Sequence, residues 1–219
     1  LRYIYIAFFL DWHALRPNQK IKLKKEFSGL DDSFIQSQIE SFLKRNPKLA
    51  VPNKQKDFKA IVKGVRASLR KLVVYASKEK IPDLNQFKKL KKEEFQELCQ
   101  NILRQNTSTR ERLNIYPPIY KEIKKLKPKR ILDLGCGLNP ISLSLSDWQG
   151  EYFAYDINRE EISFLQKFFL ILKSVTNING HASCFNLSET EKISSLPKAD
   201  LCLIFKVTDV LEQKKYKKH

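Results

Sequence analysis

The sequence predicts an α/β fold, with a parallel doubly wound sheet in residues 106–219 and a basic all-α region in residues 1–105. In the second region, short apolar segments that suit strands alternate with a segment of helical spacing, which is typical of a parallel sheet. In the first region, apolar residues recur at helical spacing. Charge also divides the chain, because the excess of Lys and Arg lies before residue 131. We therefore expect two domains with these limits.

Three helices are expected in the first region. Asp31 and Ser33 suit the amino-terminal cap of a helix that ends near Asn46 and Pro47. A second helix should run from about residue 58 to residue 76, and a third from 93 to 105.

Residues 1–130 hold 31 Lys and Arg against 13 Asp and Glu, whereas residues 131–219 hold 10 against 11, so the net charge of +17 lies entirely in the first part. A lysine-rich composition alone would spread over both parts. A basic region beside a neutral one suggests that the first binds a polyanion, nucleic acid being favoured. On the second helix we assign this role to basic residues that lie mostly off the apolar side, although solvated surface cations are the ordinary alternative for each: Lys59, Lys63, Arg66, Arg70 and Lys71.

The most informative segment is Ile131-Leu-Asp-Leu-Gly-Cys-Gly-Leu-Asn-Pro140, a buried strand followed by a glycine turn. Gly135 and Gly137 let the backbone approach a ligand closely, because they carry no Cβ. A dinucleotide site needs a third glycine where Pro140 stands, and no Lys-Ser/Thr pair follows as in a phosphate-binding loop. Asp133 would also repel phosphate. The segment instead resembles motif I of the class I S-adenosylmethionine (SAM) methyltransferases, whose ligand is cationic.

The following segments fit a nucleotide crevice at the carboxyl ends of the strands. Residues 151–156 form a second expected strand that ends in Asp156, an acid suited to accept both ribose hydroxyls. An ordinary surface aspartate is the alternative. Ile157 would pack on the adenine face, residues 158–173 have helical spacing, and residues 182–185 and 201–205 are expected as the third and fourth strands.

A second resemblance covers roughly residues 58–213. Four segments occur in the order in which one family has its motifs. They are Asn106-Thr-Ser-Thr-Arg-Glu-Arg-Leu113, Tyr116-Pro-Pro-Ile-Tyr120, Tyr152 to Ile157, and Leu203-Ile-Phe-Lys206 through Gln213. They are similar to the motifs of the aminoglycoside-resistance 16S rRNA (guanine-N7) methyltransferases. This resemblance implies a class I methyltransferase (Rossmann-like) fold and SAM as cofactor.

The resemblance also implies residue roles. Arg110 would hold the SAM carboxylate, Asp133 with Gly135 and Gly137 would face the methionine part, and Lys206 would point at the target base as the catalytic residue. An ordinary helix arginine and an exposed lysine at a strand end are the plain alternatives. Two departures stand out: Asn106 replaces the family histidine, and Asn186 occupies the place of an acid near the adenine amino group.

We therefore expect methyl transfer to guanine N7 in the decoding site of small-subunit (16S) rRNA, conferring or resembling aminoglycoside resistance. A class I methyltransferase with another RNA target and a non-catalytic RNA-binding relative are the alternatives. Guanine N7 has a free lone pair, so the chemistry needs no general base.

We further expect a cytoplasmic monomer that has the small ribosomal subunit as partner and neither a membrane segment nor a metal; the four cysteines form no C-x-x-C pair. Because the sequence stops just after the fourth strand, the sheet is expected to be incomplete and the chain a fragment.

Overall fold

The computed structural model describes residues 16–50, 54–72, 81–87, 89–187 and 189–205. The chain divides into two compact units, residues 1–77 and 78–219, and each is described by itself. Within the described residues, no helix is long and apolar enough to span a membrane.

The first unit is helical, as the apolar spacing predicted. Its helices are α1 (Pro17–Lys22), α2 (Asp32–Arg45) and α3 (Gln55–Leu72), with short 3-10 helices η2 (Lys25–Phe27) and η3 (Pro47–Leu49). The Asp31 side chain caps α2, because its Oδ1 accepts from the Ser33 and Phe34 backbone amides at 2.8 and 3.4 Å. The core of the unit consists of fully or nearly fully buried apolar residues, among them Ile21, Phe27, Ile35, Val65 and Leu69.

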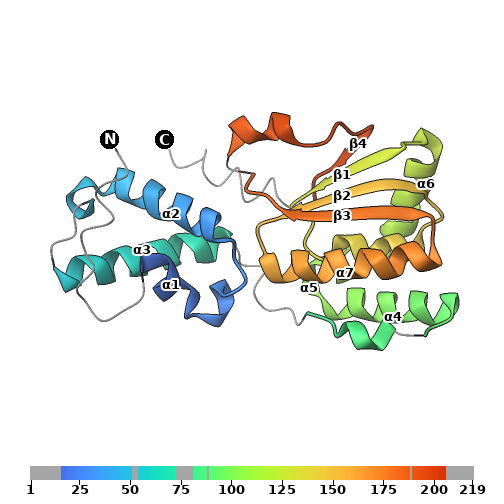
Figure 1. Cartoon of the computed structure of the whole chain (residues 1–219), viewed down its shortest axis with the longest axis horizontal. Helices are drawn as coiled ribbons and strands as arrows, with labels where there is room; N and C mark the ends of the chain where they lie inside the picture. Colours follow the sequence, from blue (N-terminus) through green and yellow to red (C-terminus); the bar gives the residue numbers. More distant parts are fainter. Residues whose placement is uncertain (1–15, 51–53, 73–80, 88, 188, 206–219) are drawn as a thin grey trace. The chain divides into compact units, whose positions relative to one another are not determined.

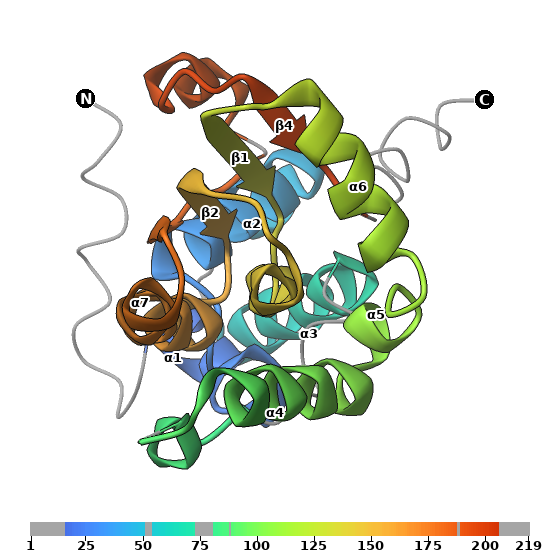
Figure 2. The same ribbon diagram turned by 90° about the vertical axis from the view of Figure 1, so that its right-hand side faces the viewer.

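The second unit is built on a four-stranded parallel sheet with the order β3-β2-β1-β4 (Figures 1 and 2). The strands are β1 (Arg130–Leu134), β2 (Gly150–Asp156), β3 (Ile178–Cys184) and β4 (Leu201–Leu203). In the register, Ile131 lies opposite Tyr152 on one side and Leu201 on the other. The helical segments are η4 (Leu84–Phe87), α4 (Lys92–Gln105), α5 (Thr107–Arg110), α6 (Tyr116–Leu126), η5 (Asn139–Leu145), α7 (Arg159–Val175) and η6 (Thr190–Ser195).

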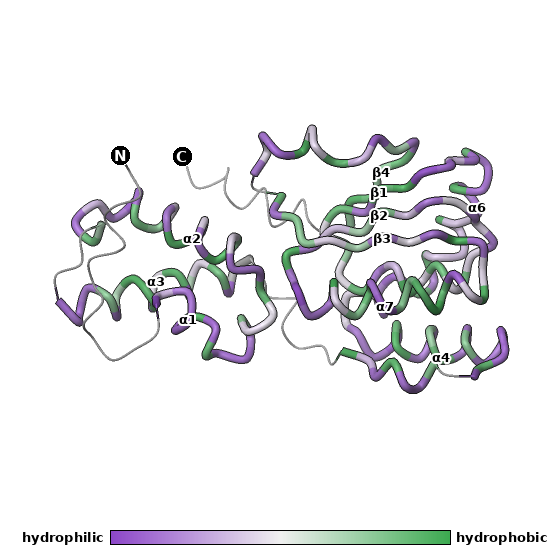
Figure 3. The backbone as a smooth tube through the Cα atoms, viewed as in Figure 1, coloured by the Kyte–Doolittle hydropathy of each residue, from purple (hydrophilic) through white to green (hydrophobic). Residues whose placement is uncertain are grey.

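Helix α7 covers one face of the sheet, and α4 packs beyond it. The Phe168 ring of α7 stacks on the Phe95 ring of α4 with centroids 6.0 Å apart, and both side chains are buried. Gly180 of β3 lets α7 approach closely, because a Cβ there would lie 2.0 Å from the Phe169 ring. Figure 3 shows that α4 and α7 each carry hydrophobic and hydrophilic residues along their length, as helices with one buried side do.

The α/β fold with a parallel sheet is thus confirmed. The third strand begins at Ile178, four residues before the expected start, because residues 178–181 pair with β2 as well. The compact units divide before α4, since its apolar side belongs to the core of the sheet unit. The limit at 105/106 remains a prediction about function.

Candidate functional site at the carboxyl ends of the strands

The glycine turn after β1 is held against the end of β2. Gly135 and Gly137 have φ angles of +69° and +49°, in the left-handed region that favours glycine. The backbone amides of Gly135 and Cys136 both donate to the Tyr155 carbonyl oxygen, at 2.8 and 3.0 Å. The predicted turn therefore lies where the carboxyl ends of β1 and β2 meet.

The carboxylate of Asp156, at the end of β2, accepts hydrogen bonds from the backbone of this turn and of the segment that follows the strand. Its Oδ2 accepts from the Gly137 amide at 2.9 Å and its Oδ1 accepts from the Asn158 amide at 3.0 Å. Burial raises the pKa of the carboxyl above its ordinary value, while these backbone amides act in the opposite direction. The structure thus brings Asp156 and the two glycines together, and their role at a cofactor stays a prediction.

Asp133 is fully buried beneath the turn. Its Oδ2 accepts from the Tyr152 hydroxyl at 2.6 Å and from the Asn139 side-chain amide at 2.9 Å. Its Oδ1 is buried without a hydrogen-bond partner, and so is the Asn139 Oδ1. Burial raises the pKa of Asp133 to about 6, despite the opposing effect of the two donors and of the Arg112 charge. Buried polar atoms without partners are rare, and here both are oxygens, which suits a ligand that carries donors.

Arg112 is the buried cation of this region, whereas Arg110 at the end of α5 is exposed. The Arg112 Nε donates to the Tyr116 hydroxyl at 3.5 Å, and its guanidinium lies 5.3 Å from the centre of the Phe205 ring, just beyond β4. Sequence reasoning missed Arg112, although it lies in the same motif two residues later. The assignment of the SAM carboxylate to Arg110 stays a prediction.

Asn106, which stands where the resemblance implies a histidine, forms the cap of α5. Its buried Oδ1 accepts from the Ser108 and Thr109 amides at 3.1 and 3.2 Å, which fixes the start of the segment that leads to Arg112. Its Nδ2 has no partner. The departure is therefore accommodated as a structural cap.

Three further predicted residues lie around the crevice or beyond the described chain. Ile157 is half-buried directly after Asp156. Asn186 is buried after β3, and its Nδ2 donates to the Glu189 Oε1 at 2.9 Å. Lys206 lies outside the described residues.

The basic residues of α3 fall into two groups. Lys59 and Lys63 are exposed. Arg66 donates to the Lys20 carbonyl oxygen, and Arg70 pairs with Glu26 at 2.8 Å, so both arginines make contacts within their own unit. The Lys71 side chain lies outside the described part. The two lysines therefore remain the better candidates for phosphate contacts.

No group of three or more His, Cys, Asp or Glu side chains with metal-site geometry occurs among the described residues.

Comparisons with known proteins agree with this geometry. The ribosomal RNA methyltransferase (FmrO) family model matches residues 92–218. The 16S rRNA (guanine(1405)-N(7))-methyltransferase of Proteus mirabilis is 29% identical over 124 residues, which cover 53% of this chain and 41% of that protein. The chain thus matches about two fifths of the length of this curated relative.

Solved structures show the same fold. The crystal structure of the 16S rRNA methyltransferase RmtF in complex with S-adenosyl-L-homocysteine superposes with a TM-score of 0.61 at 19% identity, covering 92% of this chain and 72% of that one. The 16S rRNA methylase RmtB also gives 0.61 at 19% identity, with 92% and 75% covered. An rRNA methylase from Escherichia coli gives 0.60 with the same identity and coverage as RmtB.

Proposed function

The chain belongs to the ribosomal RNA methyltransferase (FmrO) family, and from this premise we propose that it transfers the methyl group of SAM to a guanine N7 in the decoding site of 16S rRNA. The name of the curated relative supports this choice of base and atom. The biological effect would be, or would resemble, aminoglycoside resistance.

The observation that carries the proposal is the presence of a buried acid, Asp133, and a buried arginine, Arg112, in the same part of the sheet unit. The amino-acid part of SAM is a zwitterion, with an ammonium and a carboxylate. The unpartnered Oδ1 of Asp133 suits the ammonium, and the guanidinium of Arg112 suits the carboxylate. A site for a phosphate ligand would not bury an acid here.

The rest of the cofactor would lie along the turn. Gly135 and Gly137 would pass close to the methionine chain, Asp156 would accept from the ribose hydroxyls, and Ile157 and Asn186 would flank the adenine. Gly137 has a φ angle of +49°, and a Cβ there would contact Glu161 Oε2 at 3.6 Å.

The chemistry requires alignment more than acid–base groups. The N7 lone pair forms a bond to the methyl carbon as the bond from that carbon to sulfur breaks, so the sulfonium becomes a neutral thioether and the guanine gains the positive charge. No proton moves in this step. The crevice therefore contributes mainly by holding the reactants in line and excluding water. The target base would be flipped out of its stack to reach this site, where Lys206 is proposed to face it.

The small ribosomal subunit would be bound through phosphates, with Lys59 and Lys63 as contacts. Their side chains are exposed and lie on α3, within the part of the chain that carries the excess positive charge. We also propose that the protein acts as a cytoplasmic monomer.

The test is to incubate the protein with labelled SAM and intact small subunits, and to map 7-methylguanine by borohydride–aniline cleavage. One cleavage in the decoding site is expected. Cleavage elsewhere would indicate another RNA target, and binding of the subunit without transfer would indicate a non-catalytic RNA-binding relative.

A further inference from the structure

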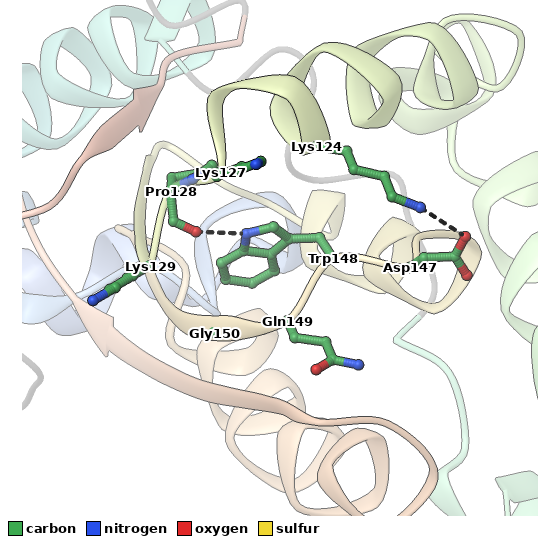
Figure 4. A pocket seen from close by; sticks show the side chains of 8 residues that line it. All are labelled: Lys124, Lys127, Pro128, Lys129, Asp147, Trp148, Gln149 and Gly150. Atoms are coloured by element: carbon green, nitrogen blue, oxygen red, sulfur yellow. Dashed lines mark hydrogen bonds and ion pairs between the residues drawn. The ribbon is translucent and has the colours of Figure 1, made fainter.

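A second group of basic residues lies at the amino ends of β1 and β2, whereas the proposed cofactor site lies at their carboxyl ends. The last turn of α6, the connection to β1 and the segment before β2 enclose a shallow depression of about 380 Å³ (Figure 4). Lys124, Lys127 and Lys129 surround the indole of Trp148, and Asp147 lies at one side. None of these residues takes part in the proposed cofactor site.

The backbone under the lysines is fixed at several points. The buried indole of Trp148 donates from Nε1 to the Pro128 carbonyl oxygen at 2.9 Å. The amides of Lys129 and Arg130 both donate to Asp200 Oδ2, at 2.8 and 2.9 Å. Gly150 fits because a Cβ there would lie 2.4 Å from the Lys129 carbonyl oxygen. The three lysines therefore project from a rigid base.

The acids nearby balance this charge only in part: Asp200 lies against the Lys129 backbone and attracts the charge of that lysine, and Asp147 lies beside Lys124. Glu122 pairs with Lys125 and Glu151 pairs with Arg130, each at 2.7 Å. Lys125 and Arg130 do not line the depression, so these two acids do not neutralise the lysines that do. Asp147 lies 3.9 Å from Lys124, and both side chains are mostly exposed, so this pair is weak. Within the described residues, no acid lies within ion-pair distance of Lys127 or Lys129.

The dipole of α6 does not explain why all three lysines lie around this depression. Lys124 lies in the last turn of α6, where a cation stabilises the helix end. Lys129 lies beyond that end, and Lys127 adopts a left-handed conformation with φ +51° to turn the chain toward β1. The helix end therefore accounts for only one of the three cations, and Lys124 and Lys129 point to opposite sides of the depression, so the positive charge is spread along its rim (Figure 4).

We propose that this depression binds the phosphodiester backbone of the rRNA substrate at a place remote from the reacting guanine. The inference rests on the proposed function, because it takes rRNA as the substrate. Lysine ammonium groups suit phosphate oxygens as point charges. The Trp148 indole is 6% exposed, so it offers no face on which a base could stack and the contact is with the backbone. The site anchors the enzyme on folded RNA and does not read sequence.

The experiment compares two triple variants of the full chain. The test variant is Lys124→Gln, Lys127→Asn and Lys129→Gln; asparagine is used at 127 because it tolerates the left-handed conformation. The control variant, Lys92→Gln, Lys167→Gln and Lys173→Gln, removes the same charge from exposed sites on α4 and α7. Binding to purified 16S rRNA is measured by filter retention at several salt concentrations, and SAM binding by calorimetry.

We expect the test variant to bind rRNA roughly tenfold more weakly than the control, with a shallower salt dependence, because fewer counterions are released. SAM affinity should be unchanged, which shows that the variant is folded. Equal binding of the two variants to purified rRNA would overturn the proposal. If the variants then differed only in binding to intact subunits, the depression would contact a ribosomal protein and not the rRNA, and the proposal would also be wrong. Failure of the proposed function is seen separately, as rRNA binding by the unmodified protein without methyl transfer from SAM.

Discussion

The hydroxyl of Tyr152 on β2 donates a 2.6 Å hydrogen bond to the carboxylate of Asp133 on β1, so the acid beneath the glycine turn is oriented by the neighbouring strand. The bond also fixes which oxygen of Asp133 stays without a partner: Oδ2 is engaged and Oδ1 is available to a ligand. Both residues are buried.

Removing this hydroxyl should weaken both the fold and the cofactor site. We expect Tyr152→Phe to lower the free energy of unfolding by about 2 kcal/mol, the order expected for a buried hydrogen bond to a charged group. It should also raise the pKa of Asp133 further. Urea unfolding measures the first effect. Tyr155→Phe is the matched control on the same strand, and an equal loss in both variants would show that the bond to Asp133 is not the cause.

Cofactor binding should depend on pH through Asp133. Because burial raises the pKa of this acid to about 6, it becomes protonated as pH falls through that value, and the neutral form no longer attracts an ammonium. SAM affinity, measured by calorimetry between pH 5 and 8, is therefore expected to fall on the acid side.

The contribution of Asp133 to folding stability changes with pH in the opposite direction to SAM affinity. Ionising the buried acid is costly, so its contribution to folding improves as pH falls from about 6 toward its ordinary pKa of about 4. In Asp133→Asn, both pH dependences should disappear. A pH profile for SAM affinity that is the same in this variant would exclude Asp133 as the titrating group.

Asp156 should prove essential for SAM binding. Asp156→Ala removes the expected acceptor of the ribose hydroxyls and frees the Gly137 amide, so affinity should fall at least 100-fold, corresponding to about 3 kcal/mol. The control is Glu151→Gln at the other end of β2, where only an exposed pair with Arg130 is lost. Unchanged affinity in Asp156→Ala, measured by calorimetry, would contradict the ribose assignment.

The two arginines of the same motif can be separated. We expect Arg112→Gln to weaken SAM binding by about 100-fold, because a buried charge-assisted pair with the carboxylate is lost, and Arg110→Gln to change it by less than about threefold. Arg112→Lys should restore little, since lysine cannot form the bidentate pair. The reverse order of effects, with Arg110 dominant, would support the assignment made from the motif alone.

Much of the sheet region was predictable because its signals are local. The strand ending at Leu134, the two glycines and Asp156 lie in continuous segments whose apolar pattern and turn residues specify their conformation. These residues meet at one edge because parallel strands present their carboxyl ends together.

Other features depend on contacts between distant segments. Arg66 and Arg70 contact Lys20 and Glu26, which lie more than 40 residues earlier, and helical spacing does not reveal such partners. Their predicted contact with RNA stays a prediction. The burial of Arg112 depends on the turn at 111–115, between a four-residue helix and α6, where no periodicity tells which arginine points inward.

The strand order has a consequence for how the molecule folds. Ile131 pairs with Tyr152 across a short stretch of chain, but with Leu201 only after 70 residues have been closed into a loop. Since longer loops lose more chain entropy on closure, the β3-β2-β1 ribbon should form before β4 docks. During refolding followed by pulsed hydrogen exchange, amides of β2 are expected to gain protection ahead of those of β4. Phe205, which follows β4, would then reach the Arg112 guanidinium in the last stage, so the crevice matures only after the rest of the sheet is in place.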